Sequence, residues 1–244
     1  MSAKKQYRKL KDYHSLKDED FYDLIVDVKT QKAIISEIIQ EIIDQNKNSL
    51  VTIGILIGIL NRQQECSAAS MFLASRSFFR DSATLILTLM ELRLDLEYIA
   101  KDESNELNWI SQDKSNKKLW RVKDQILSVA KDESEKSADL KVYQFLSIIK
   151  HGNPTHGHLA FNISAKPDRI IIDENNNSIN PKHLLCLLSY QFDRSFDAVL
   201  TITKRHNVDL SSYESKMTDI KTSIKKKFVT VLKEMIREKI KPSH

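Results

Sequence analysis

The chain has 244 residues, 41% of them hydrophobic, which suits one large globular domain or two small ones. Lys and Arg exceed Asp and Glu by 38 to 33, and the net charge of +5 is compatible with a nucleic-acid partner without requiring one. Two cysteines far apart, Cys66 and Cys186, argue against a disulfide framework or a thiolate metal cage and favour a reduced, cytoplasmic protein.

The N-terminal part of the chain predicts a basic tail followed by two helices. Residues 1–17 have neither the apolar core nor the cleavage site of a secretory signal. From 18 to 45, apolar residues recur at steps of three and four, which predicts an amphipathic helix. A second helix is expected over 49–60, and its apolar run is too short for a membrane span, which needs about 20 residues. Gly54 and Gly58 share one face of this helix, which indicates tight packing in the core, with a dimer interface as the alternative.

The middle of the chain predicts three further helices. A long one is expected from 65 to 101, with a kink near 80–82, and Glu91 lies among its apolar residues, where a carboxylate needs a partner. The polar stretch 102–116 predicts a surface connection. Helices over 117–130 and 137–150 follow, separated by charged residues.

A weak strand signal precedes the last two helices. Two short, partly alternating segments within 158–173, joined by a turn with Pro167, predict a small β-hairpin. Asn180-Pro181 is typical of a helix start, and this helix should reach about residue 206. Ser211, with Glu214 three residues on, resembles a capping box for a last helix that ends near residue 240. Because only four glycines and four prolines interrupt the chain, we expect an all-α, multi-helix bundle of long antiparallel helices with this one hairpin, in a single domain spanning 18–240.

The segment 150–158 (KHGNPTHGH) holds three of the seven histidines and two of the four glycines. Gly152 and Pro154 are placed to end the preceding helix. The chain has neither a glycine-rich phosphate loop nor a nucleophile elbow, which argues against an ATPase, a dinucleotide enzyme or a serine hydrolase. The segment is therefore the candidate site.

Three interpretations of these histidines stay open. His156 and His158, two residues apart, could bind a metal with His151, although the segment offers no Cys or carboxylate ligand. Alternatively, a histidine could exchange protons with a ribose 2′-hydroxyl or the leaving oxygen of RNA without any metal. A cation, Lys150 or Arg76, would then offset phosphate charge, and Asn153 or Thr155 would bind a phosphate oxygen. In the third interpretation, His151 simply caps the helix end.

Two stretches carry a family resemblance. Residues 85–102 (LILTLMELRLDLEYIAKD) and 143–152 (YQFLSIIKHG), followed by the hairpin and a closing helix, resemble a bacterial domain family of unknown function grouped with the HEPN superfamily. The likeness covers residues 18–205. It implies a HEPN-like helical domain that forms homodimers and, in many members, acts as a metal-independent ribonuclease in toxin–antitoxin, abortive-infection or antiviral systems, with an Arg and a following His of two subunits meeting in a cleft.

The resemblance also implies roles for particular residues. His156 would be the catalytic histidine, with His151 as the alternative match. Lys150 stands where the superfamily has Arg, and Thr88 stands where relatives have another Arg; a lysine cannot grip phosphate with two hydrogen bonds as a guanidinium can. Glu91 would match an acidic residue of the preceding helix. We therefore expect an RNA-binding protein able to act as a metal-independent ribonuclease, with no cofactor, no membrane association, and a second copy or an antitoxin as partner; the alternatives are a non-catalytic interaction module and a histidine-based metal-binding protein.

Overall fold

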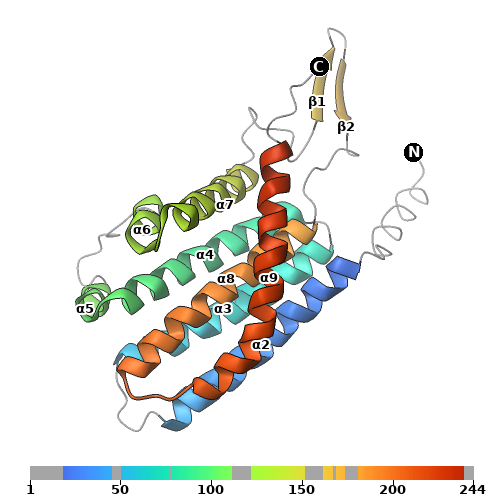
Figure 1. Ribbon diagram of the computed structural model, residues 1–244. Coiled ribbons are helices and arrows are strands. Elements are labelled where there is room, and N and C mark those ends of the chain that lie inside the picture. Colours follow the sequence, from blue (N-terminus) through green and yellow to red (C-terminus); the bar gives the residue numbers. More distant parts are fainter. Residues whose placement is uncertain are drawn as a thin grey trace.

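The computed structural model describes residues 19–45, 51–76, 78–111, 122–151, 162–166, 169–173 and 181–238. This part of the chain contains eight helices and two short strands (Figure 1). The helices are α2 (Glu19–Gln45), α3 (Val51–Ser75), α4 (Phe79–Lys101), α5 (Glu103–Ser111), α6 (Val122–Val129), α7 (Glu133–His151), α8 (Pro181–Arg205) and α9 (Ser211–Glu238). The all-α bundle is confirmed, whereas the basic tail 1–17 lies outside the described residues.

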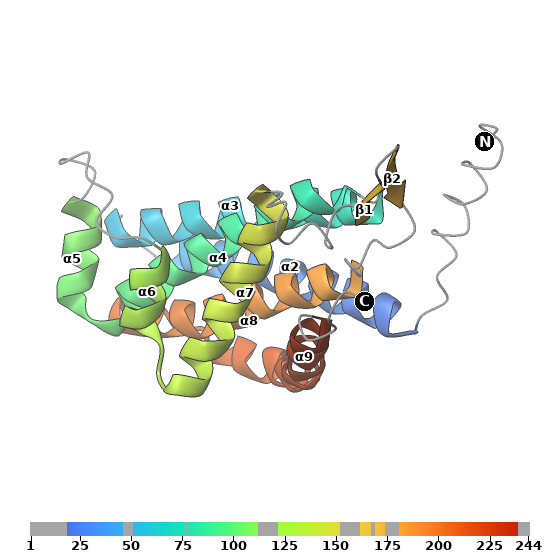
Figure 2. The same cartoon turned by 90° about the horizontal axis from the view of Figure 1, so that it is seen from above.

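Helix α8 is the centre of the bundle. It packs against α2, α3, α4 and α9, and 18 of its 25 residues are buried. One cluster of buried hydrophobic side chains joins seven of the eight described helices. Helix α5 contributes no fully buried side chain to it. Figure 2 shows α3 and α9 on opposite sides of the molecule, with α8 between them. The core is therefore built around a helix that comes late in the sequence.

The long helices do not all run antiparallel. Arg205, at the end of α8, donates hydrogen bonds to the carbonyl oxygens of Ile99 (3.1 Å) and Ala100 (2.8 Å), at the end of α4. Helices α4 and α8 are therefore parallel, and they begin at the same end of the bundle (Figure 1). Helix α7 runs antiparallel to α4, because its last turn bonds to the first turn of α4 through Arg80 and Lys150.

Several predicted boundaries are wrong. Helix α3 continues through the polar block 61–64, because Gln63 points into the core and donates to Ser195 (2.8 Å) while Arg62 stays exposed. Helix α3 ends at Ser75 and α4 begins at Phe79, before the kink expected at 80–82, and the Phe78 amide bonds to the Leu73 carbonyl (2.9 Å). The expected connection 102–116 contains α5, and α7 begins four residues earlier than expected.

The predicted tight packing of Gly54 and Gly58 in the core is also wrong. Both glycines are exposed on α3, and a Cβ atom added at either would meet no atom within 4 Å. The apolar composition of this helix therefore does not mean that all of its faces are buried.

The two strands are β1 (Asn162–Lys166) and β2 (Arg169–Asp173). They pair antiparallel, with Asn162 opposite Asp173 and Lys166 opposite Arg169. The expected hairpin began at residue 158, and 158–161 lie outside the described residues, as does Asn180 before α8.

A left-handed residue ends α8. Asn207 has φ 59°, its amide bonds to the Lys204 carbonyl (3.3 Å), and the next amide, of Val208, bonds to the Thr203 carbonyl (2.9 Å). This is the Schellman arrangement, in which a residue with positive φ allows the final carbonyls to be satisfied. It turns the chain into α9, where Asp209 Oδ1 accepts from the Ser211 amide (2.9 Å).

Candidate functional site

The candidate site lies at the end of the bundle where α4 begins and α7 ends. Arg80, in the first turn of α4, donates from Nε to the carbonyl oxygen of Lys150 (3.0 Å), in the last turn of α7. Arg76 lies four residues before Arg80 at the α3–α4 turn, and its guanidinium lies 5.5 Å from the centre of the Phe72 ring. Arg80 and Lys150, from two helices, thus meet at the point where the histidine segment begins, and Arg76 lies in the turn that leads into α4.

The start of α8 lies at the same end, because α8 is parallel to α4. Its first turn carries Lys182 and the buried His183. The acidic Asp81 is exposed in the first turn of α4, so the bases at this end have an acid beside them. We call Arg76, Arg80, Lys150 and Lys182 the basic end.

The structure brings some of the predicted site residues together and separates another. Lys150 and Arg76 both belong to the basic end. Glu91 lies eleven residues after Arg80 on α4, about 16 Å along the helix axis, and is half-buried. His151 is the last residue of α7. The remaining predicted residues, Asn153, Thr155, His156 and His158, lie outside the described residues.

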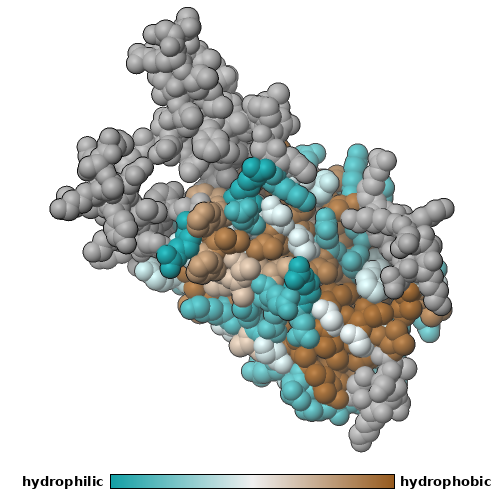
Figure 3. Space-filling model, turned by 180° about the vertical axis from the view of Figure 1, so that it is seen from behind, coloured by the Kyte–Doolittle hydropathy of each residue, from teal (hydrophilic) through white to brown (hydrophobic). Residues whose placement is uncertain are grey.

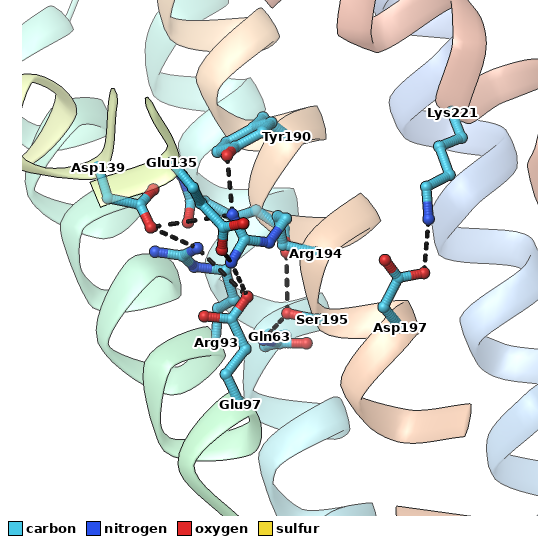
Figure 4. A network of polar contacts seen from close by, with 11 residues as sticks. Gln63, Arg93, Glu97, Glu135, Asp139, Tyr190, Arg194, Ser195, Asp197 and Lys221 are labelled. Atoms are coloured by element: carbon cyan, nitrogen blue, oxygen red, sulfur yellow. Dashed lines mark hydrogen bonds and ion pairs between the residues drawn. The ribbon is translucent and has the colours of Figure 1, made fainter. Parts of the chain in front are cut away.

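A network of buried charges crosses the middle of the bundle (Figure 4). Arg93 of α4 is fully buried and donates to Asp139 of α7 (3.0 Å) and Glu97 (3.4 Å). Arg194 of α8 contacts Glu97 (2.6 Å) and also binds Glu135. The Tyr190 hydroxyl accepts from Arg194 (3.0 Å). Helices α4, α7 and α8 are therefore tied together by two arginines and three carboxylates.

The positions of these charges shift their pKa values in different directions. Burial alone would lower the pKa of Arg93 and of Arg194, but the neighbouring carboxylates outweigh it, so both pKa values are raised. Burial raises the pKa of Glu97 despite the two arginines. Burial also raises the pKa of Tyr190 to about 12. Both guanidinium groups therefore stay charged, and they serve to hold helices together.

A pocket of about 470 Å³ opens over one side of this network. Glu97 and Arg194 form part of its wall, together with Lys101, Lys131 and Asp197. One turn before Asp197 on α8, burial raises the pKa of Asp193 to about 6. The pocket carries charges of both signs at its rim and gives the network access to solvent.

A second polar cluster closes the opposite end of the bundle. Glu106 of α5 is buried, and its carboxylate accepts hydrogen bonds from Arg205 (3.1 Å) and from Thr52 of α3. It also lies 3.1 Å from His206 Nε2. Burial raises the pKa of this carboxyl, but the hydrogen bonds from Thr52, His206 and Arg205 outweigh it, so the pKa is lowered. The cluster joins the end of α8 to α5 and the start of α3.

Sequence reasoning missed both clusters. Glu106 lies in the stretch expected to be a surface connection, and Arg194 and Asp139 are charged residues within helices. The one available signal was periodicity, because Arg93 falls among the buried apolar residues of α4. Partners 46 or more residues away cannot be read from such a pattern.

Comparison with known family models, with curated proteins and with solved structures finds no match to this chain. Among the described residues, no helix is long and apolar enough to cross a membrane. In the same part of the chain, histidines, cysteines and carboxylates do not gather in threes as a metal ion would require. The candidate functions therefore depend on the geometry of the basic end and on the chemistry of the segment that follows it.

Proposed function

We propose that the protein binds RNA at the basic end and cleaves it without a metal ion, using the histidine segment. The observation that carries this proposal is the contact between Arg80 and Lys150. Helix α7, which leads into the histidine segment, has Lys150 where phosphate binding favours arginine. Arg80 of α4 supplies a guanidinium beside it. With one N–H on the Lys150 carbonyl, Arg80 keeps its other donors for a phosphate oxygen.

The chemistry follows from the residue types. A neutral histidine, His156 or His151, takes the proton of a ribose 2′-hydroxyl, whose oxygen attacks the adjacent phosphorus. The bond to the 5′-oxygen breaks, and a protonated histidine gives that oxygen its proton. The products are a 2′,3′-cyclic phosphate and a 5′-hydroxyl. Arg80 and Lys150 offset the charge that develops on the phosphoryl oxygens.

The test is cleavage of mixed RNA by the purified protein in EDTA. We expect cleavage that survives the chelator, leaves cyclic phosphate ends, and is lost in His156→Ala or His151→Ala. Arg80→Ala should weaken RNA binding severalfold or more, with partial rescue by Arg80→Lys. Lys123→Ala, an exposed lysine on α6 near the far end of α4, is the matched control and should bind RNA as wild type does.

Two outcomes would overturn the proposal. If Arg80→Ala and Lys123→Ala lower RNA affinity equally, binding is not localised at the basic end. If RNA is bound but never cleaved, the enzymatic part fails. A second candidate function, a non-catalytic interaction module, is favoured by the large apolar side chains exposed on α3, Val51 (64%) and Phe72 (60%), and would be supported if RNA is not bound at all.

A further inference from the structure

Within the part of the bundle that the structure describes, one face of α3 stays exposed. The first ten residues of this helix, 51–60, contain no charged residue, and a helix that is apolar on all sides is normally buried on all sides. Yet Val51 is 64% exposed and Phe72 60% exposed. Viewed from behind, where α3 lies, the molecule displays broad hydrophobic areas (Figure 3). Large apolar side chains exposed together on one helix indicate a contact site.

A single stripe runs along this face with the spacing of a helix–helix interface. Its members are separated alternately by three and four residues, the repeat that keeps one seam facing a partner helix. They are Ile55, Gly58, Arg62, Glu65, Ala69 and Phe72. All are exposed except Ile55, which is partly buried.

We propose that α3 pairs with α3 of a second copy of this chain, antiparallel, about a two-fold axis that passes between Gln63 and Gln64. Residues equally distant from the axis then face each other. Arg62 meets the partner's Glu65, and Glu65 meets the partner's Arg62. Ile55 lies against the partner's Phe72, and Gly58 lies against the partner's Ala69.

Charge complementarity selects this occupant and this orientation. Arg62 and Glu65 pair at 3.1 Å within the helix, and their side chains remain 60% and 68% exposed, so each can take a second partner across the axis. A parallel pair would instead place Arg62 beside the partner's Arg62. A second copy supplies the acid and the base in the mirrored order.

The small residues allow the helices to approach. A Cβ atom at Gly58 would meet nothing within 4 Å in the monomer, so the monomer has no packing reason for glycine at this position. In the antiparallel pair, Gly58 and the partner's Ala69 bring the two backbones close, while larger apolar side chains fill the space further along. The paired helices are about 37 Å long, which gives a narrow interface and predicts a dimer of moderate affinity.

The experiment is analytical ultracentrifugation of the full chain over a range of concentrations. Wild type should form dimers below about 100 µM. Gly58→Leu should weaken dimerisation at least tenfold without harming the fold, because the monomer has room for the side chain and glycine is a poor helix former. Thr222→Leu, an exposed position on α9 at the opposite side, is the control and should leave the dimer unchanged.

Charge reversal tests the orientation. Glu65→Arg alone should weaken the dimer at least tenfold, and the double variant Arg62→Glu with Glu65→Arg should restore it. Spin labels introduced through Val51→Cys should lie about 37 Å apart in the antiparallel pair, against about 10 Å in a parallel one. A wild type that stays monomeric, or a dimer that tolerates Gly58→Leu, overturns the proposal. This dimer does not depend on RNA binding and can be tested without RNA.

Discussion

Replacing Asp139 by alanine should destabilise the fold by about 3–5 kcal/mol, the usual cost of removing one partner from a buried ion pair. Asp139 and Arg93 both have fully buried side chains, with 3.0 Å between Oδ2 and Nη1. Without Asp139, Arg93 keeps only Glu97, at 3.4 Å, and Glu97 is also bound to Arg194, at 2.6 Å. In the variant, the buried guanidinium groups of Arg93 and Arg194 therefore have one carboxylate fewer to balance their charge.

Urea denaturation followed by circular dichroism measures this change. In thermal unfolding followed by the same signal, we expect a fall in Tm of about 6–20 °C for a chain of this size. Lys136→Ala, which removes an ion pair to the 87%-exposed side chain of Glu133, is the control and should cost less than about 1 kcal/mol. The double variant Arg93→Met with Asp139→Leu should recover much of the loss, because no unpaired charge remains. A loss below about 1 kcal/mol for Asp139→Ala would refute this account of the network.

Two further predictions concern pH and are read from unfolding free energies measured between pH 2 and pH 8. Burial raises the pKa of Asp193 to about 6, so the folded state binds this proton more tightly than the unfolded chain and loses stability as the pH rises from about 4 to 6. Asp193→Asn should therefore be more stable than wild type at pH 7, by about 1–3 kcal/mol, and equal to it at pH 4; equal stability at pH 7 would contradict the prediction. The pKa of Glu106 is lowered, so its contribution is present at neutral pH and is lost as the pH falls below about 4. Glu106→Gln should cost about 1–3 kcal/mol at pH 7, with the difference shrinking in acid; a cost independent of pH would show that the charge is not responsible.

The helical architecture could be read from the sequence, because apolar residues at three- and four-residue steps leave few alternatives over long segments. Helix α2 shows this well. Its isoleucines recur at three- and four-residue steps with polar and charged residues between them, and the helix spans Glu19–Gln45 in the structure. The break between α3 and α4 was misplaced because the polar block 61–64 looks like an interruption. Gln63 is polar and yet buried, which only its contact with Ser195, 132 residues later, explains.

The candidate site could be read only in part. The sequence predicts Lys150, which adjoins the histidines, or Arg76 as the cation that offsets phosphate charge. Arg80, which bonds to the Lys150 carbonyl, could not be found, because residues 70 positions apart become neighbours only through the antiparallel packing of α4 and α7. Glu91, the predicted acidic residue, lies eleven residues after Arg80 on α4.

The central place of α8 has a consequence for synthesis on the ribosome. The side chains of Gln31 and Ser189 bond to each other at 2.7 Å, 158 residues apart. At about 5–20 residues per second, a ribosome needs about 8–30 s to proceed from one to the other. During that time the apolar faces of α2, α3 and α4 have been made, but the helix that covers them has not. The nascent chain thus carries unburied hydrophobic surface throughout this interval, and its core can close only after Pro181–Arg205 has left the exit tunnel.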